Sequence, residues 1–280
     1  MNLRRLIPIE RFRDPPTVVA VLRLGGVIGR VGPLRTGLEL EGLAPQIEQA
    51  FSLRRLAAVA LAVNSPGGSA VQSAQIFGRI RALAEETEVP VYAFAGDVAA
   101  SGGYWLALAG DEIYADPASV IGSIGVLFRS FGLADAIQRL GIERRVHTAG
   151  TRKAALDPFR PEDADDVAML KELQADVHEV FKDAVRARRG ARLKGEEEVL
   201  FSGAFWSGKR AVELGLVDGL GDLRSVMRAH FGDRVRLRPV GGPRRWLRAR
   251  LGMAKADPAA IGDGVIAALE ERLLWSRYGL

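Results

Sequence analysis

Residues 91–125 read VYAFAGDVAASGGYWLALAGDEIYADPASVIGSIG, and they hold the strand, turn and helix from which the fold can be reasoned. Residues 91–95 form a short apolar run with the length of a buried strand, which Gly96 and Asp97 interrupt. Residues 104–109 are apolar almost all round, so they predict a helix inside the core. Ser101 therefore lies where a strand has ended and a buried helix begins.

The position of Ser101 allows two interpretations. A helix N-terminus offers unpaired backbone N–H groups and the positive end of the helix dipole. A hydroxyl there would lie beside donors that can hold a developing oxyanion. Alternatively, Ser101 is only a helix N-cap, which is a common role for serine. This stretch alone leaves both interpretations open.

Strand–turn–helix units repeat along the chain. Residues 18–24 and 56–63 predict strands, and the second ends in the glycine-rich turn 64–69. Such repeats favour an α/β fold with a mostly parallel sheet, in which ligands bind at the carboxyl ends of the strands. The two glycine-rich turns, 64–69 and 96–103, are therefore expected to meet at one cleft. Further strands are expected at residues 112–115, 143–148 and 235–240, an apolar segment at 120–126, and helices at 43–51, 71–83, 133–140, 161–189, 204–214 and 223–231.

Length and composition suggest one core with appended ends. The chain has 280 residues, of which 48% are hydrophobic. We expect an N-terminal arm at 1–16, a main domain at 17–240 and a basic helical tail at 241–280. The chain has no cysteine, which excludes disulfides, thiol catalysis and cysteine-ligated zinc. No cofactor and no metal are expected.

The net charge of +5 comes from arginines gathered near both ends of the chain. Such patches attract nucleic acid or anionic lipid, although a solvated surface is the commoner explanation. No basic motif with interleaved aromatic residues is present, so no nucleic-acid partner is expected. No run of about 18 apolar residues and no secretory signal occurs. We expect a cytoplasmic chain without a transmembrane helix. Peripheral membrane contact through the N-terminal arm or the basic tail is a further hypothesis.

A serine nucleophile needs a base, and the sequence offers two kinds. Of the three histidines, His178 and His230 are expected on the surface, which leaves His147 as the histidine candidate. Lys153 is the other option, although a lysine serves as a base only where its surroundings lower its pKa from about 10.4. Lys153 could equally be a loop lysine in solvent.

Pro66-Gly67-Gly68 supplies a possible third part of the site. Glycines can turn their N–H groups toward a substrate carbonyl because no side chain stands in the way. The alternative is a tight turn without a chemical role. Phosphate binding is disfavoured, because neither a Walker nor a dinucleotide glycine spacing is present.

Four motifs occur in order: AVNSPGGSAVQSAQI, DVAASGGYWLALAGDEIYADPASVIGSIGVL, HTAGTRKAALDPF and SGAFWSGKRAVELGLVDGLG. Together they resemble the signal peptide peptidase A family of serine peptidases over about residues 18–240. The resemblance implies the ClpP/crotonase-like α/β fold, with stacked ββα units and a Ser–Lys catalytic dyad. It also implies a homo-oligomer, either a ring or a dome.

The resemblance assigns roles by position. Ser101 corresponds to the nucleophile, Lys153 to the general base and Ser123 to the serine that hydrogen-bonds the lysine. The backbone N–H groups of Gly67 or Gly68 and of Gly102 correspond to the oxyanion hole.

Two features distinguish this chain from many family members. It shows no membrane-spanning helix at its start, and its length fits the single-length form. In an oligomer, the nucleophile and the lysine could meet across a subunit interface.

The expected function is a serine endopeptidase that hydrolyses short or unfolded peptides, signal-peptide remnants among them. Tyr104, Trp105 and Leu127 are the candidate substrate-binding side chains, and they would favour apolar or small residues. Two alternatives are a crotonase-like acyl-CoA enzyme, which would use carboxylates and a CoA site, and a non-catalytic peptide-binding scaffold.

Overall fold

The computed structural model describes residues 16–30, 37–241 and 271–280. The predicted N-terminal arm and most of the predicted basic tail lie outside these residues, so the membrane contact proposed for them stays a prediction. Within the described ranges, no helix combines the length and the apolar character needed to cross a bilayer.

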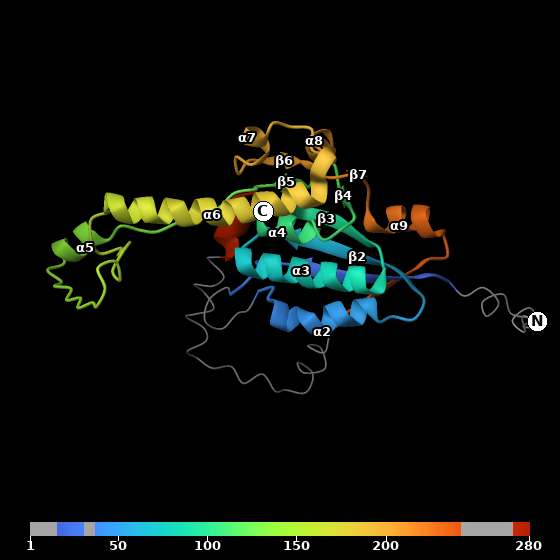
Figure 1. Cartoon of the computed structure of the whole chain (residues 1–280), viewed down its shortest axis with the longest axis horizontal. Coiled ribbons are helices and arrows are strands. Elements are labelled where there is room, and N and C mark those ends of the chain that lie inside the picture. The colour runs from blue at the N-terminus through green and yellow to red at the C-terminus, as the bar shows by residue number, and fades with distance from the viewer. Residues whose placement is uncertain (1–15, 31–36, 242–270) are drawn as a thin grey trace, which may run out of the picture.

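A mostly parallel sheet forms the centre of the molecule (Figure 1). Its main path runs β6-β5-β3-β2-β1-β8. Outside this path, β4 pairs with β3, and β7 pairs with β4. Every strand pair is parallel except β5 with β6. This confirms the predicted α/β class. The strands are β1 Val18–Gly25, β2 Leu56–Ser65, β3 Val91–Ala100, β4 Glu112–Ala115, β5 Val120–Gly122, β6 Phe205–Ser207, β7 Gly219–Leu220 and β8 Arg236–Pro239.

Helices cover both faces of this sheet. One face packs against α2, α3, α4 and α6 in the main apolar core, and the other packs against α9. Burial on both faces explains why the central strands are continuous apolar runs rather than alternating ones. The helices are α2 Leu40–Phe51, α3 Ala70–Thr87, α4 Gly102–Ala107, α5 Ala134–Arg139, α6 Ala164–Arg189, α7 Glu197–Leu200, α8 Gly208–Glu213 and α9 Leu223–Phe231.

Helix α4 is fully buried, as its all-round apolar sequence predicts. Tyr104 has no exposed surface, and its hydroxyl donates to the carbonyl of Leu216 at 2.7 Å. Burial raises the pKa of the Tyr104 hydroxyl, which therefore stays protonated. Tyr104 belongs to the core, and the prediction that it binds substrate is not supported by its position.

Strand β3 is longer than predicted, because it continues through Gly96 and Asp97 to Ala100. The side chain of Asn64 bridges this part. Its Nδ2 donates to Asp97 at 2.9 Å, and its Oδ1 accepts from the backbone N–H of Val98 at 3.0 Å. This side chain stands in for the backbone ladder where the β2–β3 register shifts. The Gly-Asp sequence alone predicts a break in the strand, because the hydrogen bonds from Asn64 depend on a residue far away in the sequence.

Two other predicted elements differ from the structure. Residues 143–148 form no strand; they are exposed and pair with none of the described strands. The helix predicted at 204–214 divides into β6 and α8. Ser207 causes this division, because its Oγ accepts from the backbone N–H of Arg210 and caps α8, while Phe205–Ser207 pair with β5.

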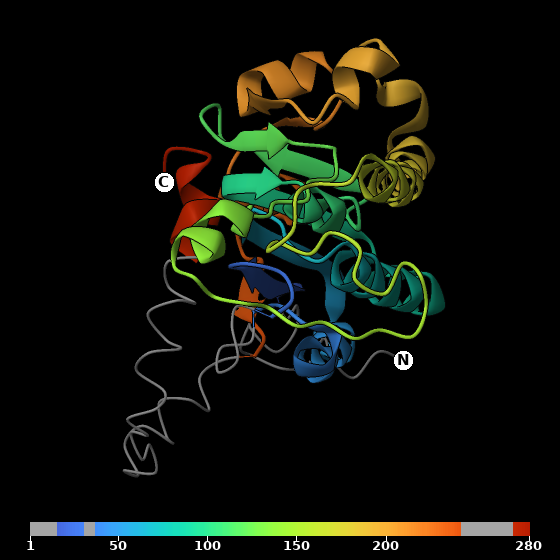
Figure 2. The ribbon, with the colours of Figure 1, turned by 90° about the vertical axis from the view of Figure 1, so that its left-hand side faces the viewer.

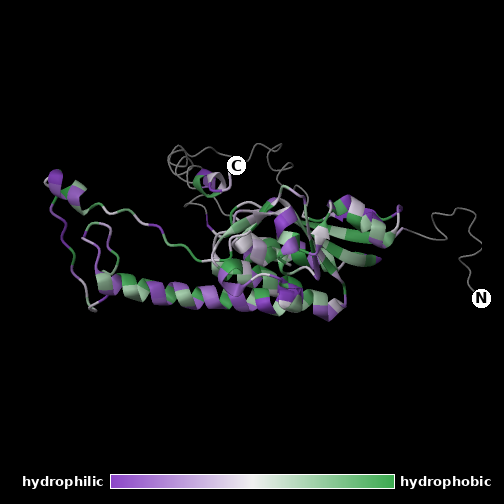
Figure 3. Ribbon diagram, turned by 90° about the horizontal axis from the view of Figure 1, so that it is seen from above, coloured by the Kyte–Doolittle hydropathy of each residue, from purple (hydrophilic) through white to green (hydrophobic). Residues whose placement is uncertain are grey.

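Residues 126–163 extend away from the body of the molecule. They are here called the arm, and they are distinct from the predicted N-terminal arm. Figures 1 and 3 both place the arm and α5 at the far end of the long helix α6. The arm exposes large apolar side chains, and Phe131 is 81% exposed. Figure 2 views the molecule from the arm's side, with α5 in the foreground. An apolar surface held away from the core is typical of an interaction surface.

Candidate active site

Ser101 lies between the end of β3 and the start of α4 in a strained backbone conformation. Its φ is 53° and its ψ is −125°, a combination that residues other than glycine seldom adopt. Its N–H donates to the carbonyl of Gly122 at 2.7 Å, and its carbonyl accepts from the N–H of Trp105 at 3.1 Å. The side chain makes no capping hydrogen bond. Ser101 therefore holds the N-cap position while its hydroxyl stays free for another role.

The two glycines after Ser101 let α4 approach the neighbouring elements closely. A Cβ added to Gly102 would lie 2.4 Å from the Oγ of Ser73 on α3, and one added to Gly103 would lie 2.3 Å from the carbonyl oxygen of Ser65 on β2. Real Cβ atoms do not approach other atoms so closely. The Ser-Gly-Gly sequence is thus a packing requirement of the turn that presents Ser101.

The turn Pro66-Gly67-Gly68 lies directly against this serine. A Cβ on Gly67 would be 2.8 Å from the Cβ of Ser101 and 2.9 Å from the backbone nitrogen of Gly102. Gly68 also lies near this turn, because a Cβ on Gly102 would be 3.4 Å from the nitrogen of Gly68. The structure therefore brings together the two glycine-rich turns that the sequence predicted to share a cleft.

Two backbone N–H groups near Ser101 have no acceptor among the described residues. The parallel bridge to Ile28 uses the carbonyl of Gly67 and the N–H of Ser69, and it leaves the N–H of Gly68 unused. The N–H of Gly102, at the first position of α4, also has no acceptor among the described residues. Two unpaired donors next to a strained serine form an arrangement that can hold an oxyanion.

Ser123 lies on the turn that follows β5. Its side chain is buried, its φ is 52°, and its N–H donates to the carbonyl of Ala204 at 2.7 Å. Strand β5 pairs with the last three residues of β3. Ser123 and Ser101 consequently line the same cavity.

This cavity has a volume of about 600 Å³ and an apolar wall. Trp105 and Phe181 stack with ring centroids 4.5 Å apart, and both line it together with Leu127. Trp105 is 4% exposed, and its indole N–H has no hydrogen-bond partner among the described residues. Of the three predicted substrate-binding residues, Trp105 and Leu127 line the same cavity as Ser101.

His178 also lines the cavity, although the sequence predicted a surface position for it. Its Nε2 lies 3.1 Å from the carbonyl oxygen of Ile124, next to Ser123, so the ring N–H can donate to that carbonyl. His178 precedes the buried Phe181 by three residues on α6, and that spacing could have placed it on the inward face. His147, the histidine preferred from the sequence, lies exposed on the arm.

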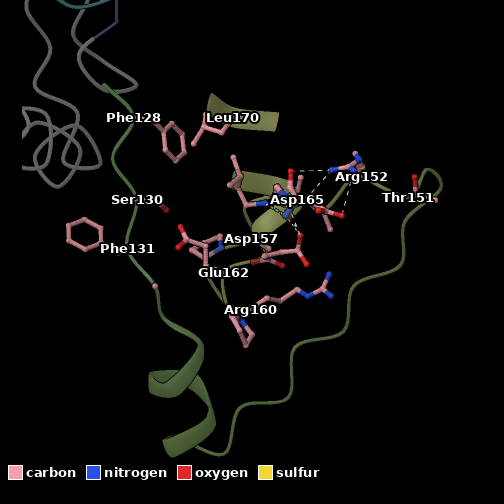
Figure 4. A pocket seen from close by; sticks show the side chains of 18 residues that line it. Phe128, Ser130, Phe131, Thr151, Arg152, Asp157, Arg160, Glu162, Asp165 and Leu170 are labelled. Carbon is pink, nitrogen blue, oxygen red and sulfur yellow. Dashed lines mark hydrogen bonds and ion pairs between the residues drawn. The ribbon is translucent and has the colours of Figure 1, made fainter. Parts of the chain in front are cut away.

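Lys153 is not beside Ser101 within one chain. It lies exposed on the arm, its N–H donates to the carbonyl of Gly150, and it does not line the Ser101 cavity. A separate open cavity of about 970 Å³ lies next to it (Figure 4). This cavity is bounded by residues 128–132 and 151–163 of the arm and by the first turns of α6. There, Arg152 forms ion pairs with Asp165 and Asp166.

Within the described residues, no group of three or more His, Asp or Glu side chains could hold a metal ion. A strained serine between a strand and a helix is the arrangement that presents the nucleophile in several serine hydrolases. The sequence model of peptidase family S49 matches residues 84–231, a span that includes Ser101, Ser123 and Lys153. The chain belongs to peptidase family S49, and its α/β fold is of the ClpP-like type.

Two curated relatives and one solved structure illustrate the similarity. The protein named Na(+)/H(+) antiporter NhaA of Brucella abortus (strain 2308) is 49% identical over 99% of this chain and 39% of its own length. The chloroplastic serine protease SPPA of Arabidopsis thaliana is 33% identical over 73% of this chain and 31% of its own. A 1510-N membrane-bound stomatin-specific protease, in complex with a substrate peptide, is 13% identical over 85% of this chain and 99% of that one, with a TM-score of 0.49.

The chain spans about two fifths or less of the length of these two curated relatives. Their names therefore describe those longer proteins as a whole. Family membership favours a peptidase over the two alternatives, an acyl-CoA enzyme and a non-catalytic scaffold.

Proposed function

We propose that the chain is a Ser–Lys endopeptidase that hydrolyses short or unfolded peptides. The supporting observation is the strained Ser101 near the N–H groups of Gly68 and Gly102, neither of which has an acceptor among the described residues. The Oγ of Ser101 would attack the scissile carbonyl while a neutral Lys153 takes the hydroxyl proton. The two N–H groups would stabilise the negative charge on the carbonyl oxygen, a contribution of about 3 kcal/mol for one such donor.

The second half of the reaction uses the same groups. Collapse of the tetrahedral intermediate breaks the C–N bond, and Lys153 returns its proton to the leaving amine. Water then attacks the acyl-Ser101 ester, with Lys153 again as the base, and releases the second product. Ser123 would accept or donate a hydrogen bond that fixes the direction of the amine.

The lysine would reach the serine between subunits. Lys153 sits on an arm that leaves its own body, and the arm exposes apolar side chains that a neighbour could cover. Docking would also remove water from the amine, which favours its uncharged form. We therefore propose a homo-oligomer, in which the arm of one subunit brings Lys153 to the Ser101 cavity of the next.

The cavity points to the class of peptide. Trp105 and Phe181 are almost buried and reach the cavity with a small part of their surfaces, and the exposed Leu127 adds an apolar side chain from the start of the arm. Apolar or small residues next to the scissile bond would bury their surface there, as in remnants of signal peptides. A cytoplasmic location is part of this proposal.

A mixing experiment tests the proposal. Ser101→Ala and Lys153→Ala should each abolish hydrolysis of an apolar fluorogenic peptide. Mixed oligomers of the two variants should regain about a quarter of the activity, because some sites then combine an intact serine with an intact lysine from different subunits. Labelling by a fluorophosphonate, followed by mass spectrometry, should modify Ser101 alone.

Each failure has a distinct meaning. Full activity of Lys153→Ala would refute the dyad. No recovery in mixtures that demonstrably exchange subunits would refute the shared site while leaving the dyad standing. No labelling of Ser101 in the wild-type oligomer would refute the peptidase mechanism.

A further inference from the structure

The C-terminal residues 271–280 return to the Ser101 cavity (Figure 1, red). Leu274, Arg277 and Tyr278 all line that cavity. The ring of Tyr278 packs edge-on against Phe205 of β6, with centroids 5.2 Å apart, and Leu274 packs against Val27. The segment thus contacts the body through two apolar contacts at separate places.

The segment forms a wall of the cavity and does not fill it. About 600 Å³ remains open beside Ser101 while Leu274 and Tyr278 are in place. Their partners, Phe205 of β6 and Val27 of the loop after β1, do not line the cavity. A peptide could therefore enter with the segment still bound, and its side chains would touch the segment.

Arg277 gives this wall a charge. Among the described residues that line the cavity, it alone carries a fixed charge; the others are apolar residues, glycines, serines, Tyr278 and His178. Arg277 makes no ion pair within the described part of the chain, and its guanidinium lies 5.7 Å from the centroid of the Tyr278 ring. A guanidinium with no anionic partner beside an apolar cavity attracts a carboxylate.

We propose that Leu274, Arg277 and Tyr278 are part of the substrate cleft, and that Arg277 selects peptides with a Glu or Asp side chain near the cleaved bond. This inference rests on the proposed peptidase function. It narrows the substrate class from apolar peptides to apolar peptides that carry one carboxylate. Because Arg277 is exposed, the preference is modest, about two- to fivefold.

Matched peptides test the selection. Four pairs of fluorogenic apolar peptides are compared, one pair for each of four positions around the cleaved bond. In each pair, one peptide has Glu at that position and the other has Gln, which has the same shape but no charge. The wild-type oligomer should cleave the Glu form with the higher kcat/KM at one position. Arg277→Gln should abolish that ratio, and Arg277→Glu should invert it. Arg272→Gln, which removes the same charge from an exposed site outside the cavity, should keep the wild-type ratio.

Salt and binding give independent readouts. Raising the salt to about 1 M should bring the wild-type ratio toward one, because screening weakens an exposed charge pair. The Ser101→Ala variant should bind the Glu peptide more tightly than the Gln peptide in fluorescence anisotropy, and Arg277→Gln in that background should remove the difference.

The outcomes separate this inference from the peptidase proposal. Cleavage that depends on Ser101 but shows no Glu preference at any position would overturn the inference alone. An equal fall in kcat/KM for both peptides in Arg277→Gln would assign Arg277 to the reaction and overturn the selection. If Tyr278→Ala raised kcat/KM for every peptide, the segment would be an inhibitory plug, and the inference would be wrong. Absent cleavage with a retained binding difference would count only against the peptidase proposal.

Discussion

Gly67 and Ser101 lie so close together that a Cβ on the glycine would be 2.8 Å from the Cβ of the serine. The contact joins the turn after β2 to the end of β3, and it places the backbone of Gly67 and Gly68 next to Ser101 and Gly102. Parallel strands end at the same edge of a sheet, so loops after neighbouring strands can build such a site together. A substitution at Gly67 should therefore displace the turn relative to the serine and change catalysis directly.

Gly67→Ala tests this closeness. The added methyl group would push the turn away from Ser101, and the φ of 104° is strained for alanine. We expect kcat to fall about 100-fold or more, as when one oxyanion donor is lost. Gly78→Ala is the matched control, because nothing lies within 4 Å of its added Cβ on α3. It should leave kcat unchanged; an active Gly67→Ala enzyme would contradict the assigned oxyanion hole.

Lys153→Arg tests whether an uncharged amine is needed. Arginine keeps the positive charge and the length of the side chain but cannot give up its proton near neutral pH. We expect Lys153→Arg to be as inactive as Lys153→Ala, while circular dichroism and oligomer size stay unchanged. Lys171→Arg, an exposed lysine on α6, serves as the control and should remain active. Substantial activity in Lys153→Arg would assign the lysine a purely electrostatic role.

His178 should hold the turn that carries Ser123. Its Nε2 lies 3.1 Å from the carbonyl oxygen of Ile124. His178→Ala removes this donor and should lower kcat by about tenfold, the equivalent of one hydrogen bond of about 1–1.5 kcal/mol. His178→Gln can place an amide N–H at a similar position and should recover most of the loss. A Gln variant as slow as the Ala variant would point to the imidazole itself taking part in the reaction.

The ion pair between Arg189 and Asp218 should make the free energy of unfolding fall as the pH is lowered into the acid range. Arg189 is buried, and its Nη1 lies 2.7 Å from Asp218. Burial alone would raise the pKa of Asp218, but hydrogen bonds from Arg189 and from the N–H of Ile113 outweigh it and lower that pKa below 3.8. The stabilisation is therefore complete above the unfolded-state value near pH 4 and disappears as the pH falls through the lower folded-state value.

Asp218→Asn tests this sign by thermal unfolding between about pH 2 and pH 7. The variant should lose about 2–3 kcal/mol at pH 7, because the buried Arg189 would lack its counter-charge. The difference from the wild type should shrink at the acid end of the range. A constant difference across the range would show that the pair does not titrate with unfolding.

The sequence by itself determined the α/β class, the buried helix after Ser101 and the meeting of the two glycine-rich turns. These follow from local patterns, because apolar runs, periodicity and glycine placement act over a few residues. Only the tertiary structure decided that β3 runs on through Gly96 and Asp97, that His178 faces the cavity, and that residues 271–280 return to form its wall. It also decided that Lys153 stands apart from Ser101 in one chain. These features depend on contacts between residues far apart in the sequence, whose formation no local pattern records.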